Sequence, residues 1–215
     1  NIVDTLFSKH DAVSKLGYVR PKLSGLNQDQ LETISTILAF RALFSSANTF
    51  SKDTLIKELE LIKRNQQLIF ENDKLISDLT ITVNILIVTG DYYTFGHKPI
   101  LKYLASLFIA RLPLDQKVIF YHKILSGDKI TLNPSLLNFL FELDFQILLK
   151  EFLIPKMDHS SFAYSNNPSD IIIKDFLKLH FGYEDTHYNN RDIIEKLKKK
   201  YKVDNDNDLG ELFTL

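Results

Sequence analysis

Long apolar segments follow one another through the middle of this chain, and only short breaks with helix-capping and turn residues separate them. The segments lie at residues 75–88, 100–112, 114–125 and 136–153. They recur at intervals of roughly twenty residues, so two of them form a unit of about forty, the size range of helix-pair repeats. We therefore expect an all-α fold of about eight to ten helices, stacked as antiparallel pairs in a right-handed α-solenoid or an irregular helical bundle.

Residues at the ends of the first segments match known helix-boundary signals. Asn27 and Gln30 have the spacing of a capping box, and apolar residues at helical spacing follow as far as Phe44. Ser51 is a candidate cap for a second helix, which runs to Phe70 with lysines along its solvent side. These signals predict two long helices before residue 72.

Residues 74–89 allow two interpretations, because their centre is rich in β-branched side chains. Periodicity alone does not separate a buried strand from a buried helix. The segment is longer than the usual strand of about 4 to 8 residues and lies among predicted helices, so we favour a helix over a strand. It ends at Gly90, and we expect residues 90–96 to form a loop that carries Tyr92, Tyr93 and Phe95.

The most apolar segment begins at Asn133, a candidate N-cap that is followed by Pro134 at the first helical position. We expect one helix over residues 133–153. It leaves few side chains for water: Asn138, Glu142, Asp144, Gln146, Lys150 and Glu151. So wide an apolar surface indicates burial on more than one side, or a docked partner.

A change of composition after Pro155 suggests how the chain is organised. Residues 1–157 are expected to form a helical, repeat-like core, and residues 158–170, rich in Ser and Asn, a flexible polar loop. Residues 171–215 then supply C-terminal helices and an acidic and apolar tail, packed on the same domain. Because the chain begins with Asn1, we interpret it as an excised domain or a trimmed protein.

Composition restricts the class of protein. The chain has 215 residues, no cysteine and a net charge of -1, from 26 basic and 27 acidic side chains. The missing cysteines exclude disulfides and thiolate metal sites, which favours an intracellular protein of the nucleus or cytoplasm. The balanced charge gives no overall attraction to nucleic acid. No segment is long and apolar enough for a transmembrane helix.

In helix length, short connections and unit size, residues 27–157 resemble the HEAT and armadillo class of α-helical repeats. The resemblance is one of architecture, and no residue of a family consensus is carried over. It implies a curved stack of helix pairs with a face that binds a protein or a peptide. We therefore expect an intracellular protein–protein interaction module, a scaffold or adaptor within a larger complex.

Two sets of residues are candidates for partner binding. The first is aromatic, because aromatic side chains dominate interface hot spots. It comprises Tyr92, Tyr93, Phe95, Phe139, Phe141 and Phe145. The second is basic and could contact phosphates or acidic side chains: Lys196, Lys198, Lys199, Lys200 and Lys202. The lysines leave open an alternative, a helical domain that associates with nucleic acid. We favour the simpler interpretation, in which these lysines form the solvent face near the C-terminal end of a helix.

Catalytic and metal-binding patterns are weak. His180, Glu184 and His187 have ligand types, but Gly182 interrupts a helix that would align them. The alternating Asp204, Asp206 and Asp208 lack the glycine and glutamate that a calcium loop needs further on. No phosphate-binding glycine loop or nucleophile elbow occurs. We expect no enzyme, cofactor or metal, and an enzyme or enzyme-regulatory domain without a recognisable motif stays the remaining alternative.

Overall fold

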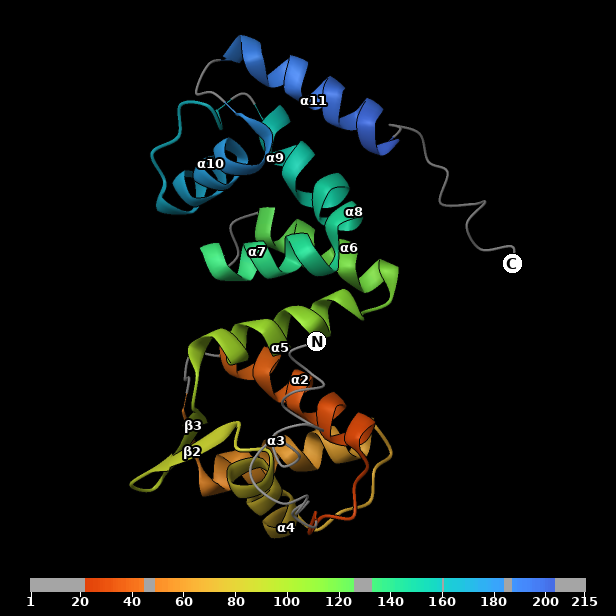
Figure 1. The fold of residues 1–215 in the computed structure, drawn as a ribbon, viewed down its shortest axis with the longest axis vertical. Helices are drawn as coiled ribbons and strands as arrows, with labels where there is room; N and C mark the ends of the chain where they lie inside the picture. The colour runs from red at the N-terminus through yellow and green to blue at the C-terminus, as the bar shows by residue number, and fades with distance from the viewer. Residues whose placement is uncertain (1–21, 45–48, 126–132, 160, 184–186, 204–215) are drawn as a thin grey trace, which may run out of the picture. The chain divides into compact units, whose positions relative to one another are not determined.

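The computed structural model describes residues 22–44, 49–125, 133–159, 161–183 and 187–203. These residues are mostly helical and include a three-stranded sheet, so the predicted helical class is confirmed and the sheet is an addition. The chain divides into two compact units, Asn1–Leu112 and Pro113–Leu215, coloured red to green and green to blue in Figure 1. None of the described helices has the length and apolar character that a membrane span requires.

The first unit is built on two helices that lie side by side, α2 (Gln28–Phe44) and α5 (Lys98–Ala110) (Figure 1). The predicted capping box begins α2, because the Asn27 amide donates to Gln30 Oε1 at 3.0 Å and the Gln30 amide donates to Asn27 Oδ1 at 2.9 Å. Each of these helices carries a fully buried serine, Ser35 on α2 and Ser106 on α5. The third helix, α3 (Lys52–Asn65), begins at the predicted Ser51 cap.

The prediction of one helix over residues 74–89 is wrong. The segment starts as α4 (Asn72–Ser77), continues as the π-helical turn η2 (Asp78–Thr82) and ends as strand β2 (Leu86–Thr89). Asn84 lies between them with φ 55°, a left-handed conformation that asparagine tolerates better than most residues. The helical stretch therefore ends before Asn84, and β-branched residues after it pair in a sheet.

The predicted loop of residues 90–96 is also wrong, because most of it is strand β3 (Tyr92–Phe95). This strand pairs antiparallel with β2 on one side and with β1 (Thr49–Ser51) on the other. Gly90 and Asp91 form the two-residue hairpin turn, and Gly90 has the positive φ of 59° that such turns need at their first position. Phe50, Leu86 and Phe95 bury one face of the sheet.

A buried carboxylate connects residues 23 and 24 to η2. Asp78 is fully buried at the beginning of η2. Its two oxygens accept hydrogen bonds from the backbone amides of Leu23 and Ser24, each at 2.8 Å, and Oδ1 also accepts one from the Thr82 hydroxyl at 3.3 Å. The charge is stabilised by donors that lie 55 and 54 positions earlier in the chain.

All regular secondary structure in the described residues of the second unit is helical. It contains α6 (Leu114–Leu125), α7 (Pro134–Leu143), α8 (Phe145–Leu148), the π-helical turn η3 (Leu149–Leu153), α9 (Ile154–Asp158), α10 (Pro168–Phe181) and α11 (His187–Tyr201). Asn133 caps α7 as predicted, because its side chain accepts a hydrogen bond from the Leu136 amide at 3.0 Å. Ile193, Ile194 and Leu197 form the buried side of α11, which packs beside α9 (Figure 1).

The single helix predicted over residues 133–153 is interrupted at Asp144, and the helical path then continues through α9 to residue 158. The apolar pattern predicts that Asp144 faces solvent, but Asp144 is buried. Its carboxylate accepts hydrogen bonds from Lys117 Nζ at 2.7 Å and from the Tyr121 hydroxyl at 3.0 Å, both on α6. Burial and the neighbouring Asp144 charge raise the pKa of the Tyr121 phenol, so Tyr121 stays protonated and remains a donor.

Candidate functional site

Aromatic rings from three separate segments of the second unit meet in one group. We call this group the aromatic cluster; it consists of Phe141, Phe145, Phe176, His180, Phe181 and Tyr201. Phe141 is central, with ring centroids 5.0 Å from Phe145, 5.3 Å from Phe176 and 4.7 Å from His180. Only Phe176 in the cluster is buried, while His180 is exposed and the other rings are half-buried.

Local structure brings these rings together. Phe141 and Phe145 lie on either side of the interruption at Asp144. Their positions therefore depend on the Asp144 carboxylate, which accepts hydrogen bonds from two side chains of α6. Phe176 and His180 are four residues apart on α10 and therefore share one helix face; their ring centroids are 4.4 Å apart. Gly182 ends α10 in the left-handed conformation, with φ 66°.

Tyr201, the last residue of α11, joins the lysine-rich helix to the aromatic cluster. Its ring centroid lies 4.6 Å from that of Phe145 in an edge-to-face arrangement. This contact places the C-terminal end of α11 beside α8 (Figure 1). The phenylalanines and the lysines are separate candidates in the sequence. The contact of Tyr201 with Phe145 joins them in one surface.

The lysines of α11 divide into two groups by direction. At 3.6 residues per turn, Lys198 and Lys200 lie roughly 60° and 100° around the helix from Tyr201, and Lys196 and Lys199 lie roughly 140° and 160° away. Lys200 Nζ is 5.1 Å from the centroid of the Tyr201 ring, a cation–π distance. We call the aromatic cluster together with Lys198 and Lys200 the aromatic–lysine surface. Lys202 follows at the helix end and is exposed.

The other aromatic candidates have different environments. Phe139 is half-buried on α7. On β3, Tyr92 and Phe95 alternate between the two faces of the sheet, so Tyr92 is 54% exposed and Phe95 is 6% exposed. Tyr93 shares the inner face with Phe95 and is half-buried. A binding role for these residues stays a prediction, and Phe95 also contributes to the core.

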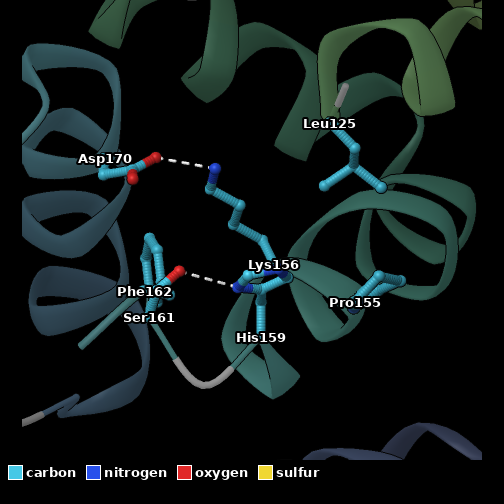
Figure 2. A pocket seen from close by; sticks show the side chains of 7 residues that line it. All are labelled: Leu125, Pro155, Lys156, His159, Ser161, Phe162 and Asp170. Atoms are coloured by element: carbon cyan, nitrogen blue, oxygen red, sulfur yellow. Dashed lines mark hydrogen bonds and ion pairs between the residues drawn. The ribbon is translucent and has the colours of Figure 1, made fainter. Parts of the chain in front are cut away.

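A pocket lies elsewhere in the second unit and has a volume of about 430 Å³. It is lined by Leu125, Pro155, Lys156, His159, Ser161, Phe162 and Asp170 (Figure 2). Lys156 extends across it and forms an ion pair with Asp170 at 2.7 Å. His159 Nδ1 and Ser161 Oγ are 2.8 Å apart and share a hydrogen bond. The pocket was not predicted, because its residues come from α6, α9, α10 and the segment before α10.

Hydrogen bonds and ion pairs fix the charged side chains around the pocket. Burial opposes ionisation of Asp170, but its hydrogen bonds with Lys156 and Ser165, together with the charges of Lys156 and Lys174, lower its pKa. Lys174 is buried, and its ammonium donates to the carbonyl oxygens of Ala163 and Ser165, each at 2.8 Å. Within the stretch predicted as a flexible polar loop, Phe162 and Ala163 are buried.

The two sequence patterns with metal-ligand residue types lie partly or wholly outside the described residues. Glu184 and the Asp204, Asp206 and Asp208 series lie outside them, and His180 belongs to the aromatic cluster. In the part of the chain that the structure describes, no three acidic or histidine side chains converge in a way that could hold a metal ion.

Comparison with known proteins finds no relative: none of the protein-family models, curated proteins or solved structures matches this chain. The proposals that follow therefore depend on its own residues.

Proposed function

We propose that this chain is a protein–protein interaction module whose second unit binds an acidic, partly apolar peptide segment of a partner. The observation that carries the proposal is the contact of Tyr201 with Phe145, since it joins half-buried aromatic rings to lysines on one surface. Aromatic rings supply contact area at little entropic cost, and lysines around them attract acidic side chains. An intracellular scaffold or adaptor in the nucleus or cytoplasm, built of stacked helix pairs, fits this role.

Charge favours an acidic peptide over nucleic acid as the ligand. Residues 113–215 contain 13 lysines and arginines and 16 aspartates and glutamates, so this unit has no net positive charge, although four lysines are concentrated near the end of α11. Nucleic-acid sites typically neutralise several phosphates along an extended basic surface. The rings of the aromatic cluster also pack edge to face on one another, so their faces are partly covered and do not form an open platform for stacked bases.

The test compares two double variants that lose the same charge from α11. Lys198→Gln/Lys200→Gln removes the lysines beside Tyr201, and Lys196→Gln/Lys199→Gln removes those on the opposite side. The probe is a fluorescein-labelled synthetic peptide in which glutamate pairs alternate with leucine and phenylalanine, and binding is followed by fluorescence anisotropy. We expect the first variant to weaken binding about tenfold and the second by less than about twofold, because screened charges act over short distances.

Equal losses in the two variants would contradict the proposal, since they would mean that only the overall charge of α11 matters. A single-stranded oligouridylate serves as the competing probe. If it binds the unmodified protein more tightly than the peptide, and with a steep salt dependence, the nucleic-acid alternative replaces the peptide.

A further inference from the structure

The pocket of Figure 2 combines an apolar wall with fixed polar groups, which is the usual composition of a small-molecule site. Leu125 and Pro155 line one side, and Phe162, which is 2% exposed, forms part of the other. Its volume of about 430 Å³ lies in the lower part of the range for ligand pockets. All of its lining residues belong to the second unit, and none belongs to the aromatic–lysine surface.

Lys156 is the group in this pocket best able to bind a ligand. An ammonium has three donors, and among the described residues Asp170 Oδ1 is the one hydrogen-bond acceptor of Lys156. Two donors are therefore left for a ligand or for water. The Lys156 side chain is only 22% exposed, so a charge-assisted hydrogen bond to it would be shielded from solvent.

The other polar groups set the sign and the size of the ligand's charge. Lys174 uses its ammonium on two backbone carbonyl oxygens but still contributes positive charge, so Lys156 and Lys174 together outweigh Asp170 by one charge. A monoanion balances this excess. A phosphate monoester carries a charge of about −1.5 to −2 at neutral pH and would be repelled by the Asp170 carboxylate.

We propose that this pocket binds a small monocarboxylate with an apolar or aromatic body. The carboxylate accepts hydrogen bonds from Lys156, with the exposed His159 imidazole at the same rim, and the body lies against Leu125, Pro155 and Phe162. This site is separate from the peptide surface proposed above, and either proposal can fail without the other.

Benzoate is the probe, and its binding to the intact chain is measured by ligand-observed NMR titration. Lys156→Gln keeps a donor for Asp170 but removes the charge, and we expect it to weaken benzoate binding at least about tenfold. Lys150→Gln, on η3 and outside the pocket lining, is the charge-matched control and should leave binding unchanged. Leu125→Trp fills the apolar side and should abolish binding, with circular dichroism showing that the helices are retained.

Three results would overturn the proposal. The first is no saturable binding of benzoate to the unmodified chain. The second is an equal effect of Lys156→Gln and Lys150→Gln, which would place benzoate elsewhere. The third is that benzyl alcohol or phenyl phosphate binds as tightly as benzoate, because the neutral compound lacks the charge and the phosphate ester carries too much of it.

Discussion

Two buried aspartates, one in each unit, lie where a helix departs from regular α geometry. Asp78 begins the π-helical turn η2, and Asp144 separates α7 from α8. Each carboxylate is neutralised or hydrogen-bonded by groups far away in the sequence: backbone amides for Asp78, and Lys117 with Tyr121 for Asp144. A polar residue inside an apolar segment therefore fixes the packing of its helix here, although a helical pattern alone would assign it to solvent.

Replacing Asp144 with alanine should strongly destabilise the second unit. The substitution leaves the Lys117 ammonium, whose side chain is 13% exposed, without its anion and leaves the buried Tyr121 hydroxyl without its acceptor. Breaking a buried pair in this way typically costs about 3–5 kcal/mol of unfolding free energy. Urea denaturation followed by circular dichroism measures the loss.

Two further variants separate this effect from a general effect of substitution in α7. Asp144→Asn keeps an acceptor for Tyr121 and should cost less than Asp144→Ala. Glu142→Ala removes an exposed acidic residue two positions earlier and should change the unfolding free energy by less than about 0.5 kcal/mol. If Glu142→Ala and Asp144→Ala lower the unfolding free energy equally, the Lys117–Asp144–Tyr121 network does not stabilise the unit.

Among the helices and strands, those defined by local signals could be predicted from the sequence. The Asn27 and Gln30 box, the Ser51 cap and the Asn133 cap each begin a helix as expected. The error in residues 74–96 arose because a β-branched run of that length fits a buried helix and a helix followed by a strand equally well. Strand β2 pairs with β3 across the two-residue turn, and β3 also pairs with β1, about forty positions earlier, a contact that no local pattern reports.

Gly90→Ala should destabilise the β2–β3 hairpin. Gly90 has φ 59°, and a Cβ at this position would meet no heavy atom within 4 Å, so the cost is one of backbone conformation alone. We expect a loss of about 1–2 kcal/mol. Amide hydrogen exchange of residues 86–95 should show it as faster exchange.

The neighbouring turn position provides the control for this variant. Asp91 is exposed and has no positive φ, so Asp91→Ala should change the exchange of the same amides only slightly. Equal acceleration by both substitutions would show that the conformation of Gly90 does not limit the stability of the hairpin.

At the scale of the whole molecule, the sequence indicates several residues of the candidate surface but not that they lie together. Phe141, Phe145 and the lysines of α11 were named from residue type alone. Tyr201 and His180 complete the surface because α11 packs beside α9 and α10 lies beside α7. The contact of Phe145 with Tyr201 joins residues 56 positions apart, and neither composition nor helical spacing contains that information.

The footprint of an acidic peptide should therefore fall on the aromatic–lysine surface and not on the β3 aromatics Tyr92, Tyr93 and Phe95. Bound to the intact chain, the glutamate-rich peptide should slow amide hydrogen exchange in α8, at the C-terminal end of α10 and in the last turn of α11, because these segments carry the aromatic–lysine surface. The exchange of the β2–β3 hairpin should stay unchanged. The same peptide with glutamine at every glutamate is the control and should protect neither region. Slower exchange of residues 92–95, without slower exchange in α11, would contradict the proposal. The partner would then cover the exposed face of the sheet, and the binding role would belong to Tyr92 and its neighbours.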